Sequence, residues 1–182
     1  YADVLIITKR FIPPSGASFL LIYAVGFSYA YITLDTATGA LVLFACVQFT
    51  MLYKNWRAGN TLNLYEKLGI LCSIIGFIYF VSPELTQPSL IGFLLMSVAG
   101  IAWGLYSIAG GQSSSPMIDT CSNFLRSTPL AFIALATLYF TDTFSVSLAG
   151  LVYTLISGGL ASGLGYALWY LVLPNLKPST AA

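Results

Sequence analysis

The sequence has very few charged residues and no histidine. Of its 182 residues, 58% are hydrophobic and only 7% are charged, whereas a soluble domain carries about 25% charged residues. A chain with so little charge could not cover its own surface in water, so the composition excludes a soluble globular domain and indicates lipid as the solvent. The absence of histidine excludes histidine general bases, Ser-His-Asp triads and histidine-ligated metals within this chain.

Cysteine is also scarce. Cys46, Cys72 and Cys121 lie in or at the ends of apolar runs, and no two of them form a CxxC pair; we interpret them as small buried hydrophobic residues. The net charge of +1 gives no indication of nucleic-acid binding, and the sequence predicts no cofactor and no metal site. The chain starts at Tyr1 and stops at Ala182, where a helix could be starting, so we expect it to be truncated at both ends.

Six apolar runs are long enough to be membrane-spanning helices, which need about 17 to 20 residues. Their apolar composition extends around all faces instead of alternating, which favours helices over transmembrane strands. A shorter run, Ala2–Thr8, has the composition of the end of an earlier helix. The six predicted helices are Ser18–Leu34, Thr36–Tyr53, Leu64–Val81, Leu90–Ala109, Ser122–Phe140 and Leu148–Leu173.

The basic residues all lie on one side of the path that these helices would trace. They flank alternate links, and they are Lys9, Arg10, Lys54, Arg57, Lys67, Arg126 and Lys177. The other links hold Asp35, Glu84 and Asp142, which we interpret as solvated external charges, and no Lys or Arg. The positive-inside rule makes the basic side cytoplasmic, so the pattern predicts a multi-pass integral membrane protein.

Two helical segments share a pattern at a constant offset of 137 residues (161 minus 24). Residues 24–30 read AVGFSYA and residues 161–167 read ASGLGYA. Because the copies lie five helices apart, they would cross the membrane in opposite directions, which is typical of the inverted-topology repeats of secondary transporters. Chance matching of common membrane residues is the alternative interpretation.

Several stretches, taken together in their order and spacing, carry a resemblance to a known family. They are residues 34–41 continuing to Gln48, residues 66–69 leading to Gly76 and Tyr79, and residues 100–107, 123–126 and 162–170. The chain resembles the EamA-type members of the drug/metabolite transporter superfamily over nearly its whole length. The resemblance implies ten helices in two inverted five-helix halves, a solute site between the halves, and export across the bacterial cytoplasmic membrane.

The fold class that we predict is therefore an all-α membrane protein, a polytopic helical bundle with inverted five-helix repeats, truncated at both ends. On the plan that the resemblance implies, the chain runs from the end of helix two to the start of helix nine. Residues 1–109 then hold the first half, together with the first helix of the second half from residue 90. Residues 110–118 are a flexible link, and residues 119–182 are the incomplete second half.

Polar and aromatic side chains within the helices are the candidates for lining a solute cavity. Each candidate has a plainer alternative: hydrogen bonding between helices for the amide, interior packing or an aromatic belt for the rings, and snorkelling to the interface for the arginine. The candidates are Gln48, Trp103, Tyr106, Ser107, Asn123, Arg126 and Tyr166.

Glycines at small-residue positions are the candidates for helix packing. Gly159 and Gly163 have the GxxxG spacing that lets two backbones approach closely. Gly26 and Gly165 lie in the two copies of the repeat. These positions either support sliding of helices or simply pack statically.

The leading functional hypothesis is a secondary transporter, not an enzyme, that moves a small metabolite, amino acid or drug-like solute by alternating access. Its partners would be that solute and the lipid bilayer; the oligomeric state is left open. One alternative is a structural or assembly subunit that transports nothing. Another is a membrane-embedded enzyme, which would need converging catalytic groups that the sequence does not show.

The topology can be tested with cysteines introduced at Asp35 and Arg57 in the full-length protein, with the native cysteines replaced. We expect a membrane-impermeant thiol reagent added to intact cells to label position 35 and to spare position 57, because the two lie on opposite sides of the membrane. Both positions should be labelled after the cells are opened. Equal labelling of both in intact cells would contradict the topology.

Overall fold

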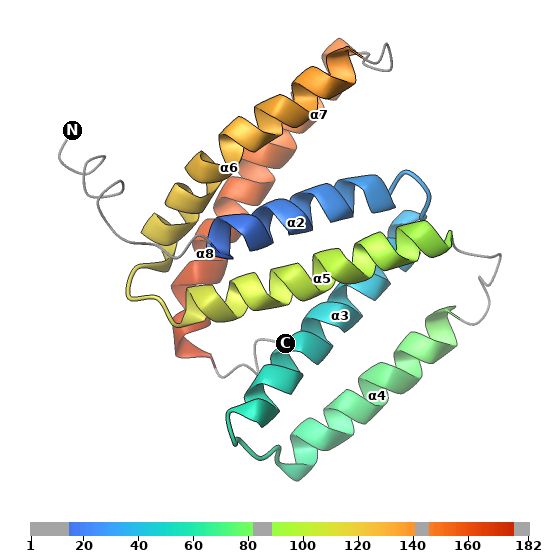
Figure 1. The fold of residues 1–182 in the computed structure, drawn as a ribbon. Coiled ribbons are helices and arrows are strands. Elements are labelled where there is room, and N and C mark those ends of the chain that lie inside the picture. Colours follow the sequence, from blue (N-terminus) through green and yellow to red (C-terminus); the bar gives the residue numbers. More distant parts are fainter. Residues whose placement is uncertain (1–14, 82–88, 141–145, 177–182) are drawn as a thin grey trace. The chain divides into compact units, whose positions relative to one another are not determined.

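The computed structural model describes residues 15–81, 89–140 and 146–176, and within these ranges the secondary structure is entirely helical (Figure 1). The prediction of an all-α membrane protein is confirmed, and each of the six predicted helices is present. In chain order the elements are α2 (Ser15–Ala30), α3 (Thr36–Arg57), α4 (Leu64–Val81), α5 (Leu90–Gly111), α6 (Pro116–Tyr139), α7 (Leu148–Leu155), the π-helix η2 (Ile156–Ser162), α8 (Gly163–Val172) and the 3₁₀ turn η3 (Leu173–Asn175).

Some sequence predictions fall outside the described residues. They are the short helix end at Ala2–Thr8 and the loop charges Lys9, Arg10, Glu84, Asp142 and Lys177. Among the described residues, three helices are long and apolar enough to cross a membrane by length and composition. These are α3, α5 and the continuous helical rod Leu148–Val172, while the apolar helix Gly16–Ala30 is shorter.

Helix α4 has the predicted bounds, whereas other helix ends differ from the prediction for local reasons. Helix α2 ends at Ala30 rather than Leu34, because the N–H groups of Ile32 and Thr33 bond to carbonyls three residues back and tighten the chain into turns. Helix α3 continues past Tyr53 to Arg57. Its last turn is polar, with Lys54 and Arg57, and therefore lies beyond the apolar run from which the end was predicted. Gly59, with φ of 81°, then ends it.

The start of α3 is fixed by a side-chain cap. The carboxylate of Asp35 accepts a hydrogen bond of 2.9 Å from the backbone N–H of Thr38. Hydrogen bonding by Thr38 holds the pKa of the Asp35 carboxyl below its ordinary value of 3.8, so Asp35 keeps its charge near neutral pH.

Helix α6 begins six residues before the predicted start at Ser122. Pro116 occupies its first turn, where a residue without an N–H costs no hydrogen bond, and Asp119 follows in the same turn. The connection from α5 is residues 112–115, and the hydroxyl of Ser113 in it donates to the carboxylate of Asp119. The predicted span Leu148–Leu173 is also not a uniform α-helix, since η2 interrupts it.

Contacts within the described chain divide it into two compact units, one of which includes residues 19–109. Its buried core consists of Ala30, Leu34, Val42, Leu43, Met96 and Ala99. Glycines allow close approach between its helices: a Cβ added to Gly26 would lie 3.0 Å from a carbonyl oxygen of α5, and one added to Gly100 would lie 2.6 Å from the Leu43 carbonyl of α3. Figure 1 shows α2 and α5 running side by side.

The other unit includes residues 110–175 and the first residues of α2. In it, α7 has no buried residue, and α6 exposes large apolar side chains such as Leu130, Phe132 and Ile133. Exposed apolar helix surfaces of this kind are stable in lipid, where each helix satisfies its own backbone hydrogen bonds.

The glycine contacts predict opposite effects for two alanine substitutions. Gly100→Ala should destabilise the protein by about 1–3 kcal/mol, because the new methyl group would overlap the α3 backbone. Gly69→Ala in α4 meets nothing within 4 Å, so it should be neutral or should stabilise by up to about 1 kcal/mol through helix propensity. Thermal unfolding of the full-length protein in detergent measures both, and equal shifts for the two variants would contradict the packing.

Candidate functional site

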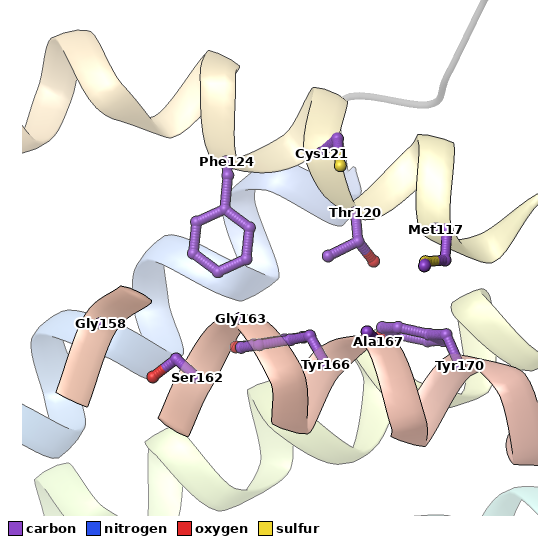
Figure 2. A pocket seen from close by; sticks show the side chains of 10 residues that line it. All are labelled: Met117, Thr120, Cys121, Phe124, Gly158, Ser162, Gly163, Tyr166, Ala167 and Tyr170. Carbon is purple, nitrogen blue, oxygen red and sulfur yellow. The ribbon is translucent and has the colours of Figure 1, made fainter. Parts of the chain in front are cut away.

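A cavity of about 300 Å³ lies between α6 and the η2–α8 rod (Figure 2). We call it the α6–α8 pocket, and all of it belongs to one compact unit. Ten residues line it: Met117, Thr120, Cys121, Phe124, Gly158, Ser162, Gly163, Tyr166, Ala167 and Tyr170.

Helical spacing brings these side chains together. The α6 residues occur at positions i, i+3, i+4 and i+7 from Met117, so they share one face of that helix. On the rod, Tyr166, Ala167 and Tyr170 likewise share a face of α8. Figure 2 shows the α6 side chains of Phe124 and Thr120 reaching towards the rod, and the two tyrosine rings lying along it.

The rod changes its helical geometry where it lines the pocket. Within η2 the backbone N–H of Gly163 bonds to the carbonyl of Gly158, five residues back instead of four. The segment contains Gly158, Gly159, Ala161 and Ser162, and these small residues leave the backbone open to the pocket. Short π-helical turns are rare and are frequently found at functional sites.

Aromatic rings form the walls of the pocket. The centroids of the Phe124 and Tyr166 rings are 5.1 Å apart at an interplanar angle of 86°, an edge-to-face contact. The rings of Tyr166 and Tyr170 are nearly parallel, at 23°, with centroids 6.4 Å apart. Both separations lie in the favourable range for ring pairs, so the rings hold one another in a fixed arrangement.

Tyr170 also closes one end of the pocket. Its side chain is only 3% exposed, and its ring packs against Gly110 near the end of α5, where any Cβ would overlap the ring. The neighbouring Gly111 has more room, because its Cβ would lie 3.5 Å from Leu173.

A second cavity, of about 550 Å³, lies between α3 and α4 in the other unit. It is lined by Leu41, Phe44, Ala45, Gln48, Phe49, Ser73, Ile74, Gly76 and Phe77. The amide oxygen of Gln48 accepts a hydrogen bond of 3.2 Å from the hydroxyl of Ser73. Gln48 therefore connects α3 to α4, which is the interhelical role that the sequence left open for it.

The predicted cavity residue Trp103 of α5 instead makes an aromatic contact with α2. Trp103 packs on Tyr23, with ring centroids 4.9 Å apart, and on Tyr106 at 5.8 Å. The series continues from Tyr23 through Phe27 to Tyr31. These residues line neither of the two cavities. Sequence analysis did not identify Tyr23 and Phe27 as partners, because nothing in a single helix shows which rings of another helix face it.

The remaining predicted cavity residues do not lie together in one site. Ser107 is fully buried beside this series, and its hydroxyl has no hydrogen-bond partner among the described atoms. Asn123 is buried against Gly16, and Arg126 is exposed. Of the seven candidates, only Tyr166 lines the α6–α8 pocket.

The packing glycines also differ among themselves. Gly26 packs against α5, whereas Gly159 and Gly165 have nothing within 4 Å of an added Cβ, and Gly163 meets only the Gly158 carbonyl of its own rod at 3.9 Å. The close approach occurs instead at Gly100 and Gly104, which have the same GxxxG spacing. Packing by Gly159, Gly163 and Gly165 stays a prediction.

Sequence analysis did not identify Thr120, Phe124, Ser162 and Tyr170 as members of one site. Placing the start of α6 at Pro116 would have revealed the periodic face from Met117 to Phe124. The pocket cysteine, Cys121, is exposed, as is Cys72, whereas Cys46 is partly buried. The prediction that all three are buried is therefore wrong.

Two adjacent glycines test the closure of the pocket by Tyr170. Gly110→Ala should displace the Tyr170 ring and destabilise the full-length protein by about 1–2 kcal/mol, whereas Gly111→Ala adds only an ordinary contact. Thermal unfolding in detergent compares the two variants. A Gly111→Ala variant as unstable as the Gly110→Ala variant would contradict the arrangement.

The chain spans about half the length of the curated relatives that it matches. It is 46% identical over 161 residues to the "Uncharacterized protein PA1977" of Pseudomonas aeruginosa, an alignment that covers 88% of this chain and 55% of that protein. It is 22% identical over 164 residues to the "Uncharacterized transporter YoaV" of Bacillus subtilis, which covers 85% of this chain and 55% of that protein. No family model matches the chain, and no solved structure matches it.

Proposed function

We propose that the chain is part of a multi-pass EamA-type transporter of the bacterial cytoplasmic membrane that exports a small solute by alternating access. The observation that carries the proposal is the α6–α8 pocket, a cavity of about 300 Å³ whose walls are aromatic and whose lining includes two aliphatic hydroxyls, those of Thr120 and Ser162. Two further observations support the proposal. The chain is similar to a protein named as a transporter, YoaV of Bacillus subtilis, and residues 24–30 and 161–167 share the pattern of an inverted repeat.

The properties of the pocket match those of small-molecule sites. Such sites have volumes of about 300–1,000 Å³ and combine apolar walls with a few polar groups. The α6–α8 pocket is at the small end of this range, which fits a metabolite or a small drug-like solute.

The geometry of the rod provides a means of changing access. Helix η2 contains two adjacent glycines at which an added Cβ would meet nothing within 4 Å, so its backbone has room to change pitch. The rod on its α8 side carries Tyr170, which closes the pocket against Gly110. In our proposal, a change of pitch at η2 moves Tyr170 away from Gly110 and opens that end, which the predicted topology places at the cytoplasmic side.

Two adjacent substitutions in η2 test whether the pocket holds the solute. Gly158 lines the pocket and Gly159 does not, and an added Cβ at either meets nothing within 4 Å. In liposomes containing the full-length protein, we expect flux of at least one solute from a broad panel. Gly158→Leu should reduce that flux at least about tenfold because its side chain fills the pocket, whereas Gly159→Leu should reduce it far less.

The comparison includes a check of folding for each variant by thermal unfolding. No flux of any solute from the panel by the folded full-length protein would overturn the transport proposal. Equal losses of flux in the two variants would overturn the assignment of the solute to this pocket.

A further inference from the structure

The hydroxyl of Ser162 lacks the intrahelical hydrogen bond that many other helical hydroxyls of this protein make, and it shares this property with the buried Ser107 hydroxyl of α5. Hydroxyls within helices commonly donate to the carbonyl four residues back. In this protein Ser28, Ser97 and Thr154 do so, with distances of 2.8 Å in each case. Ser162 lines the α6–α8 pocket but makes no side-chain hydrogen bond within the described ranges of the chain.

At Ser162 the π-helix provides a local reason for the missing bond. The carbonyl four residues before Ser162 is that of Gly158, and it accepts the N–H of Gly163 in the five-residue hydrogen bond of η2. A wider turn displaces that carbonyl from its α-helical position beneath the Ser162 side chain. The hydroxyl is therefore left available to donate to, or accept from, a molecule in the pocket.

The walls of the pocket select for a flat ring. Tyr166 and Tyr170 present nearly parallel rings along α8, and Phe124 stands edge-on to Tyr166 from the opposite helix (Figure 2). A planar aromatic group beside this pair can stack on the exposed part of Tyr166 or meet Phe124 edge-to-face, and either contact is a favourable geometry for aromatic pairs. An aliphatic solute of the same volume would make neither contact.

The lining selects against charge. None of the ten lining residues is an Asp, Glu, Lys or Arg. A charged group within an apolar membrane site without a partner is costly, so a solute with a net charge would lose far more solvation than one hydroxyl returns. The volume of about 300 Å³ is also too small for a helix, whose diameter is about 10 Å, and this favours a small molecule over a packed protein segment.

We propose that the α6–α8 pocket binds an uncharged solute with a planar aromatic ring and a hydrogen-bonding side group. The ring stacks on the exposed part of Tyr166, and its polar group bonds to the hydroxyl of Ser162. This inference rests on the proposed function, because it names the class of solute held in the same pocket.

Three indoles with a two-carbon side chain that ends in a neutral, a cationic or an anionic group test the proposal. Tryptophol is neutral and carries a hydroxyl, tryptamine is a cation, and indole-3-acetate is an anion. Binding to the full-length protein in lipid nanodiscs is measured by equilibrium dialysis. It is also measured by protection of Cys121, an exposed residue of the pocket lining, from a small thiol reagent, with all other cysteines replaced. We expect tryptophol to bind and protect Cys121, and the two charged indoles to bind at least about tenfold more weakly.

Matched variants locate the bound molecule. Ser162→Ala should weaken tryptophol binding about fivefold, whereas Thr154→Ala should not, because Thr154 lies on the same rod and bonds its own helix. Tyr166→Leu should weaken binding about tenfold, whereas Tyr153→Leu, at an exposed position of α7, should leave it unchanged.

The outcomes separate this inference from the transport proposal. Flux of other solutes without tryptophol binding would overturn the inference and leave the transport proposal standing. Equal binding of the three indoles, or binding that survives both pocket substitutions, would also overturn the inference. Tryptophol binding with the expected losses, but with no flux of any solute, would support the inference and overturn transport.

Discussion

The structure depends on one constraint: in lipid, each backbone N–H and C=O must find its partner within the protein. This constraint explains why the described chain is helical and why its helices expose large apolar side chains without penalty. It also explains why side chains cap the first turns of several helices. Asp35 caps α3, Ser147 caps α7, and Asn63 and Glu66 exchange hydrogen bonds of 2.8 Å at the start of α4. Even η2 satisfies its backbone, although with a different period.

Because lipid is as apolar as a leucine side chain, association between helices must come from close packing and not from the removal of apolar surface from water. Helix α5 shows this most clearly. Its glycines allow the backbones of α2 and α3 to approach within contact distance, and the tilted rings of Trp103 and Tyr23 pack beside that approach. By contrast, α3 and α4 leave a cavity between them, which a single hydrogen bond from Ser73 to Gln48 crosses.

Much of the fold could be predicted from the sequence, because long apolar runs are a strong signal for helices in membranes. The bounds of α4 were predicted correctly, but the end of α3 was not, since Lys54 to Arg57 continue the helix beyond the apolar run. The site was far less predictable. Trp103 was predicted to line a solute cavity, yet its ring packs on Tyr23 of another helix. GxxxG spacing occurs both at Gly100 and at Gly159, and only the packing distinguishes the two. No residue type identifies a π-turn, so the special position of Ser162 could not be seen.

The π-helix also has a geometric consequence for the rod that contains it. An α-helix rotates by about 100° for each residue, and each residue in a π-turn rotates by less, so η2 resets the angular register between α7 and α8. The side chains of α8 therefore face directions that α7 alone would not specify. As a result, Tyr166 and Tyr170 of α8 can face α6, while the direction in which the side chains of α7 point is set independently.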